Sequence, residues 1–228
     1  MAPESTASSA AVLAPVRVWD PYVRAFHWLL VTGIVAAWIT GEYGWMETHY
    51  QIGLGVIWLV TFRILWGLVG SRTARFSHFI KGPAAVISYT KTMLAPKPSH
   101  AFGHNAGGGL MVLVLLLVVL VQATSGLFNT DDVVYEAPFY AVVPDSISRL
   151  MGFLHEQLFN LLLALVALHV LVIALYFFWK RENLVRAMVT GRALLPKQDG
   201  EADFASPFRA LIVAVIAAVA PIAIYVLT

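Results

Sequence analysis

Four histidines lie in strongly apolar stretches of the sequence, where an ionisable ring is costly to place: His27, His49, His155 and His169. A neutral imidazole binds iron and other transition metals through a ring nitrogen, and ionisable residues inside apolar spans usually mark functional sites. His155 and His169 are fourteen residues apart in LHEQLFNLLLALVALHV. One helix would place them on nearly the same face, about 21 Å apart along its axis. This separation is too long for one metal ion and suits two sites.

The elements that carry these histidines are predicted to be membrane helices. Hydrophobic residues make up 59% of the 228 residues and charged residues only 12%, about half the charged share of soluble domains. Five apolar runs are long enough to cross a bilayer, which takes about 20 residues. They are 25–43, 50–70, 107–128, 152–179 and 207–227. We therefore predict an all-α integral membrane protein, in which a four-helix transmembrane bundle is followed by a fifth C-terminal transmembrane helix. The apolar content argues against a soluble bundle.

Composition also excludes several kinds of site. The chain contains no cysteine, which excludes disulfides, iron–sulfur clusters and thiolate metal sites. Its formal net charge of +2 is too small to indicate a nucleic-acid partner. The lipid bilayer is therefore the partner that composition indicates.

The distribution of charge along the chain predicts its orientation. The connection 71–104 carries five basic residues and no acid, whereas Glu42 and Glu47 flank the turn after the first span and acids dominate 129–151. Basic loops stay on the cytoplasmic side. We predict a multi-pass membrane protein with a cytoplasmic N-terminus and an external C-terminus. Residues 1–16 are predicted to form a disordered tail, 17–192 the four-helix domain, 193–206 a cytoplasmic linker and 207–228 the additional helix. Residues 82–94 and 137–151 are each expected to form a short surface helix.

The predicted direction of each span pairs the histidines by depth. His49 and His155 fall near the outer surface, and His27 and His169 fall nearer the cytoplasm. Two opposed neutral imidazoles can coordinate one iron. A haem needs only such axial ligands and an apolar slot between helices. The absence of a CxxCH sequence indicates non-covalent haem b. We predict two haem b groups in the four-helix bundle.

Two further residues are candidates for the cofactor site. Arg63 lies fourteen residues after His49, hence on the same helix face, at the depth of the cytoplasmic-side pair. A haem propionate would satisfy it, and snorkelling to the inner surface is the alternative. His104 is either a rival ligand to His27, a propionate partner, or part of a quinone or proton site. The glycines at 107–109 allow close approach of either a flat cofactor or another helix.

Five stretches resemble the bacterial cytochrome b561 family and the related b-type cytochrome subunit of nickel–iron hydrogenases. In chain order they are VRVWDPYVRAFHW, HYQIGLGVIWLVTFRILWGLVGSRTARF, GHNAGGGLM, LHEQLFNLLLALVALHV and KRENLVRAMVTGR. The resemblance covers most of 16–192 and implies a four-helix core with two b haems. It also implies location in the bacterial inner membrane, so that the external C-terminus would be periplasmic. It also implies His27, His49, His155 and His169 as the axial ligands. GHNA departs from the GHNP of the hydrogenase-type branch, and the fifth span lies outside the four-helix core.

The expected function is electron transfer between the quinone pool, with ubiquinone as a possible ligand, and an outer redox partner such as a c-type cytochrome. Acidic outer loops suit a basic partner. A superoxide:quinone oxidoreductase, known in the family, is an alternative, although it calls for a positive outer surface. A haem-bearing anchor subunit of a larger redox complex is another. A histidine-lined metal transporter would instead need ligands clustered at one depth.

Overall fold

Membrane-length helices make up most of the structure, a computed structural model that describes residues 13–93, 101–131, 134–196 and 203–227. Five helices are long and apolar enough to cross a membrane. They are α1 (Pro21–Glu42), α2 (Met46–Val69), α5 (Ala106–Ser125), α6 (Asp145–Phe178) and α8 (Pro207–Leu227). The 3-10 turn η2 (Gly126–Phe128) continues α5. The predicted all-α membrane fold is confirmed.

Shorter elements gather at one end of the bundle. They are η1 (Arg72–Ala74), α3 (Phe76–Phe79), α4 (Pro83–Met93), α7 (Leu184–Thr190) and the strands β1 (Leu13–Arg17) and β2 (Arg192–Pro196). The helix expected within 82–94 is thus present as α4. Leu94, the last residue of the predicted helix, lies outside the described residues, and so do Lys97 and His100 of the same connection.

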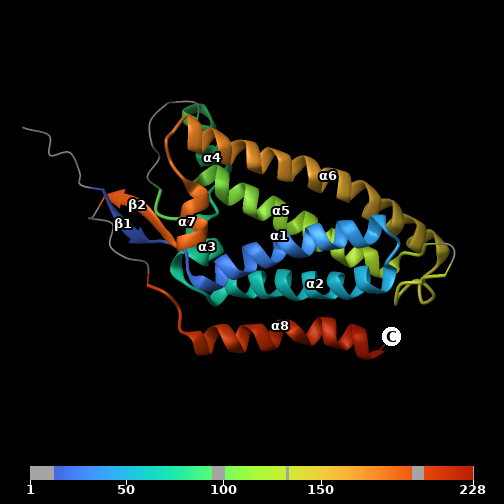
Figure 1. Cartoon of the computed structure of the whole chain (residues 1–228). Helices are drawn as coiled ribbons and strands as arrows, with labels where there is room; N and C mark the ends of the chain where they lie inside the picture. Colours follow the sequence, from blue (N-terminus) through green and yellow to red (C-terminus); the bar gives the residue numbers. More distant parts are fainter. Residues whose placement is uncertain (1–12, 94–100, 132–133, 197–202, 228) are drawn as a thin grey trace, which may run out of the picture.

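The long helices form an antiparallel bundle in which α2 is central. It packs against α1, α5 and α8, and α5 in turn packs against α6 (Figure 1). A core cluster joins these helices through Val56 and Val60 of α2, Val119 of α5 and Leu162 of α6. α8 is attached to the outside of α2, where the Trp58 indole N–H donates to the Ala214 carbonyl at 3.0 Å.

Local sequence explains where the first long helix begins. Asp20 precedes Pro21, and its carboxylate accepts from the Val23 amide at 2.7 Å, capping the helix. The same carboxylate accepts from the Trp66 indole at 3.0 Å, and both side chains are fully buried. The start of α1 is therefore fastened to the end of α2.

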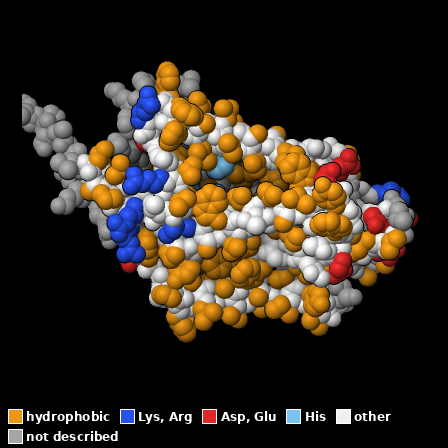
Figure 2. All heavy atoms as spheres, viewed as in Figure 1, with side chains coloured by type: hydrophobic (Ala, Val, Ile, Leu, Met, Phe, Trp, Pro, Cys, Tyr) orange, Lys and Arg blue, Asp and Glu red, His pale blue; other side chains and the backbone are white. Residues whose placement is uncertain are grey.

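Charge separates the two ends of the bundle (Figure 2). We call the end that carries β1, β2, α3, α4 and α7 the basic end, and the end that carries the α1–α2 turn and the start of α6 the acidic end. The basic end includes Arg24, Arg75, Arg186 and Arg192, and the acidic end includes Glu42, Glu47, Asp145 and Glu156. Apolar side chains cover the surface between the ends, as expected for a surface in contact with lipid.

The structure corrects two predictions at the basic end. The predicted tail 1–16 ends in β1, and the predicted linker 193–206 begins in β2; residues 1–12 lie outside the described residues. The strands pair antiparallel with Val16 opposite Ala193, and Val16 and Leu195 are buried in a core cluster with Trp66. The two strands are far apart in sequence, and each forms only by hydrogen bonding to the other. Local sequence therefore did not predict them.

The start of α6 is a further correction. The sequence predicted a separate surface helix within 137–151 and a span from 152, but one continuous helix runs over Asp145–Phe178. At about 1.5 Å per residue its 34 residues cover about 51 Å, well beyond the apolar thickness of a bilayer. The first turns of α6, which carry the charged Asp145 and Arg149, therefore project past the apolar region.

Candidate functional site

His49 and His155 face each other near the acidic end of the bundle. Their ring centroids are 6.0 Å apart and their planes are inclined at 77°. Nδ1 of His49 donates to the Ala37 carbonyl of α1 at 2.9 Å, and Nδ1 of His155 donates to the Gln122 carbonyl of α5 at 2.9 Å. Since Nδ1 of each ring is bound to a backbone carbonyl, Nε2 is left as the metal-binding nitrogen.

Two glycines let these rings approach the neighbouring backbone. A Cβ at Gly41 would lie 3.3 Å from Nδ1 of His49, and a Cβ at Gly126 would lie 2.9 Å from Cε1 of His155. Gly53, one helical turn after His49, has no such neighbour within 4 Å and faces open space. The role of Gly126 could not be predicted from the sequence, because a contact between different helices leaves no local pattern.

His27 and His169 form the second pair, on α1 and α6. They lie close enough to interact electrostatically. The His27 ring packs edge to face on Trp28 at 4.9 Å, and its Nδ1 is buried without a hydrogen-bond partner in the described part of the chain. Unlike the pair at the acidic end, this ring is not oriented by a backbone carbonyl.

Arg63 is buried inside the bundle. Only 2% of the side chain is exposed, and its guanidinium lies over the rings of Phe76 and Phe79, with centroids 5.2 and 5.7 Å from Cζ. Nη1 has no hydrogen-bond partner among the described residues. Snorkelling to the surface is therefore wrong for Arg63. A buried guanidinium with an unbonded N–H is a binding group for an anionic oxygen.

His104 lies at the basic end, in the segment that leads into α5. It packs against Trp19 and Phe79, with ring centroids at 4.5 and 4.6 Å, and its Nδ1 is buried and unbonded within the described residues. Burial, followed by the nearby charge of Arg63, lowers the pKa of His104 well below its usual range. The nearby charges that act on this ring are Arg63 first and His78 second, so His104 lies beside Arg63 in the structure.

The glycines at 107–109 pack against protein. A Cβ at Gly109 would lie 2.6 Å from the Phe79 carbonyl oxygen, and one at Gly107 would lie 2.7 Å from the Tyr89 ring. Of the two alternatives left open by the sequence, the structure shows close packing of chain segments. Tyr89 in turn contacts the buried Tyr176 hydroxyl, which accepts from Asn105 at 2.8 Å. This polar network between α4, α5 and α6 joins distant segments, so it could not be predicted from local sequence.

The structure is that of a multi-pass helical membrane protein. Pairs of histidines between its helices offer ring nitrogens that can bind a metal. No group of three or more metal-binding His, Asp or Glu side chains occurs among the residues that the structure describes. The family model of the prokaryotic cytochrome b561 matches residues 18–191. The chain belongs to this family. No curated protein and no solved structure matches the chain.

Family membership establishes the general function. The protein is a membrane b-type cytochrome that acts in electron transfer, and its family binds haem b. The matched region contains α1, α2, α5, α6 and α7 and ends before β2, so α8 lies outside it. The resemblance noted from the sequence motifs is confirmed.

Proposed function

We propose that this cytochrome binds two haem b groups, one between His49 and His155 and the other between His27 and His169, and transfers electrons between quinone and a redox partner at the acidic end. The opposition of His49 and His155 carries the proposal. Their centroid separation of 6.0 Å is close to what two imidazoles adopt when each nitrogen lies about 2 Å from one metal ion. The open space beside Gly53 further supports a flat cofactor at this level.

The second site is supported by proximity and by unsatisfied groups. His27 and His169 come from α1 and α6, and Nδ1 of His27 and Nη1 of Arg63 are buried without partners among the described residues. Leaving such donors unbonded is costly, by about 1–3 kcal/mol each. His27 and His169 would hold the haem iron, and a haem propionate would give the buried Arg63 guanidinium an anionic partner.

Haem supplies one-electron redox chemistry when it is bound. The chain contributes the ligands, holds His49 and His155 through backbone carbonyls, and places a fixed positive charge at Arg63. Surrounding side chains such as Phe26, Leu158 and Leu165 keep the space between the helices apolar. A positive charge in a medium of low polarity favours the reduced state of a nearby redox centre.

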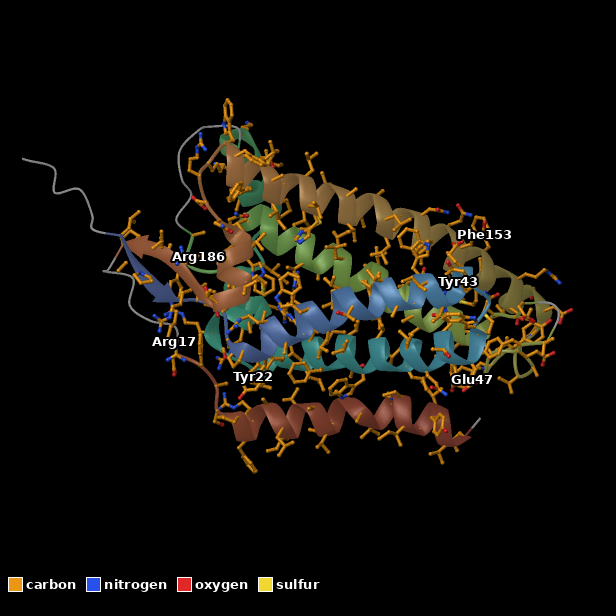
Figure 3. All side chains as sticks on the ribbon, viewed as in Figure 1. Arg17, Tyr22, Tyr43, Glu47, Phe153 and Arg186 are labelled. Atoms are coloured by element: carbon orange, nitrogen blue, oxygen red, sulfur yellow. The ribbon has the colours of Figure 1, made fainter. Side chains whose placement is uncertain are left out.

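Charge at the two ends supports the orientation and the choice of partner. We infer that the basic end faces the cytoplasm and that the acidic end, with the C-terminus of α8, faces the periplasm. Glu42, Glu47 and Glu156 are exposed near the level of His49 and His155; Figure 3 labels Glu47 there. Such a surface attracts a basic partner, for which a c-type cytochrome is our first choice. The acidic surface would repel the superoxide anion. This repulsion favours electron transfer to a c-type cytochrome over a superoxide:quinone oxidoreductase. A haem-bearing anchor subunit would use the same sites.

The experiment is reduction of the oxidised protein in liposomes by a short-chain ubiquinol, compared with reduction by superoxide. We expect rapid reduction by the quinol, followed by oxidation on addition of a basic c-type cytochrome to the acidic side. The exposed-charge variant Glu47→Gln should slow only the second step, and Asp203→Asn, an exposed acid outside the acidic end, is its control. Reduction by superoxide but not by quinol would contradict the proposal.

A further inference from the structure

A groove runs between the end of α6 and α7, on the side of the basic end. Its lining includes Val170, Ala174 and Phe177 of α6 and Leu184, Val185 and Val189 of α7. These side chains are apolar, and the α6 part belongs to a membrane-length helix. The groove therefore begins within the apolar region of the bilayer and has walls suited to a hydrocarbon chain.

The mouth of the groove carries positive charge. Arg186 is part of the lining and its side chain is exposed at the basic end (Figure 3). Arg186 is the basic residue of the lining, and the exposed Arg181 and Arg192 add positive charge to the same end of the bundle. Trp179, the residue that follows α6, is 58% exposed, as is typical of the interface between apolar chains and headgroups, so the end of α6 lies near that level.

We propose that this groove binds one anionic phospholipid, with an acyl chain between α6 and α7 and its phosphate at Arg186. Charge complementarity identifies the ligand, because a guanidinium at the rim binds a phosphate through charge-assisted hydrogen bonds, whereas the walls offer an acyl chain only apolar contact. Basic pockets between membrane helices on the cytoplasmic side recognise anionic headgroups in this way. The bound lipid fastens α7, and through it β2, to the end of α6.

The test is native mass spectrometry of the purified full-length protein, titrated with phosphatidylglycerol or with phosphatidylcholine of the same acyl chains. We expect one tightly retained phosphatidylglycerol and little retention of phosphatidylcholine. Arg186→Gln should weaken phosphatidylglycerol binding by about tenfold, as loss of a charge-assisted contact implies. Arg149→Gln is the matched control, because Arg149 is an exposed arginine of α6 at the opposite end.

A second variant tests the apolar part of the groove. Val185 is 48% exposed, so Val185→Trp should fill the groove without disturbing the core and should lower retention of both lipids. An unchanged haem spectrum and helix content confirm that each variant is folded. Equal retention of the two lipids by the wild type, or unchanged binding in Arg186→Gln, would overturn the proposal. Displacement of the lipid by a neutral long-chain quinone at equal concentration would also overturn it, since the groove would then select a tail and not a phosphate.

Discussion

His49 of α2 and His155 of α6 oppose each other with ring centroids 6.0 Å apart, and each ring is held by a backbone carbonyl of a further helix. Ala37 of α1 and Gln122 of α5 provide these carbonyls. All four helices of the matched bundle therefore meet at one pair of imidazoles. Such outer contacts fix the ring orientation and the nitrogen available to a metal.

Gly126→Ala should weaken haem binding at the acidic-end site. The new methyl group would lie 2.9 Å from Cε1 of His155, closer than van der Waals contact allows, so the ring must move. We expect the variant to lose most of one haem, measured as haem per chain. Gly82→Ala, whose Cβ meets nothing within 4 Å, is the control and should keep both haems. Full haem content in Gly126→Ala would show that His155 is not held in a ligating position.

Arg63→Gln should lower the midpoint potential of one haem. Removal of a buried positive charge disfavours the more electron-rich state, and a change of about 1.4 kcal/mol corresponds to about 59 mV for one electron. Arg63→Lys, which keeps the charge, should give a smaller shift. The measurement is a redox titration followed in the visible spectrum. If both midpoint potentials of Arg63→Gln match those of the wild type, Arg63 does not lie close enough to either haem to affect its potential.

Asp20→Ala should destabilise the folded protein. The carboxylate caps α1 and accepts from the buried Trp66 indole, so its loss removes a cap and leaves a buried donor unbonded. We expect a cost of about 2–4 kcal/mol, measured by reversible denaturation in mixed detergent micelles. Asp145→Ala is the control, because that side chain is 90% exposed and its ion pair with Arg149 lies in solvent. A loss no larger than that of the control would show that the buried carboxylate contributes little.

His104 should make stability depend on pH. Its pKa is lowered in the folded protein, chiefly by burial, whereas in the unfolded chain it titrates near about 6.5. The unfolded chain therefore binds more protons as the pH falls below that value, and the stability present above it is progressively lost. Thermal unfolding at about pH 7.5 and about pH 5 should show this loss in the wild type and a smaller loss in His104→Gln. An identical loss in both proteins would exclude His104 as its source.

The membrane helices could be predicted from sequence because lipid imposes long apolar runs. The predicted span 207–227 coincides with α8, whereas α1 begins earlier than its apolar run because Asp20 and Pro21 provide the helix start. The pairing of His49 with His155 followed from depth alone. The groups that surround this pair could not be predicted in the same way. The carbonyls of Ala37 and Gln122, the contact of Gly126 and the strand pair all depend on contacts between distant segments. Arg63 was predicted at the depth of the cytoplasmic-side pair, whereas its burial against Phe76 and Phe79 required the structure.

The chain should carry two haems on two independent histidine pairs. The most direct measurement is the haem content of the purified protein by pyridine haemochrome, combined with reduced-minus-oxidised spectra, for the wild type, His155→Ala and His27→Ala. His78→Ala, a histidine of α3 outside both pairs, is the control. We predict two low-spin b haems per chain in the wild type and the control, and one, with different band positions, in each of the other two variants. One haem per chain in the wild type, or loss of both haems from a single folded variant, would contradict the account.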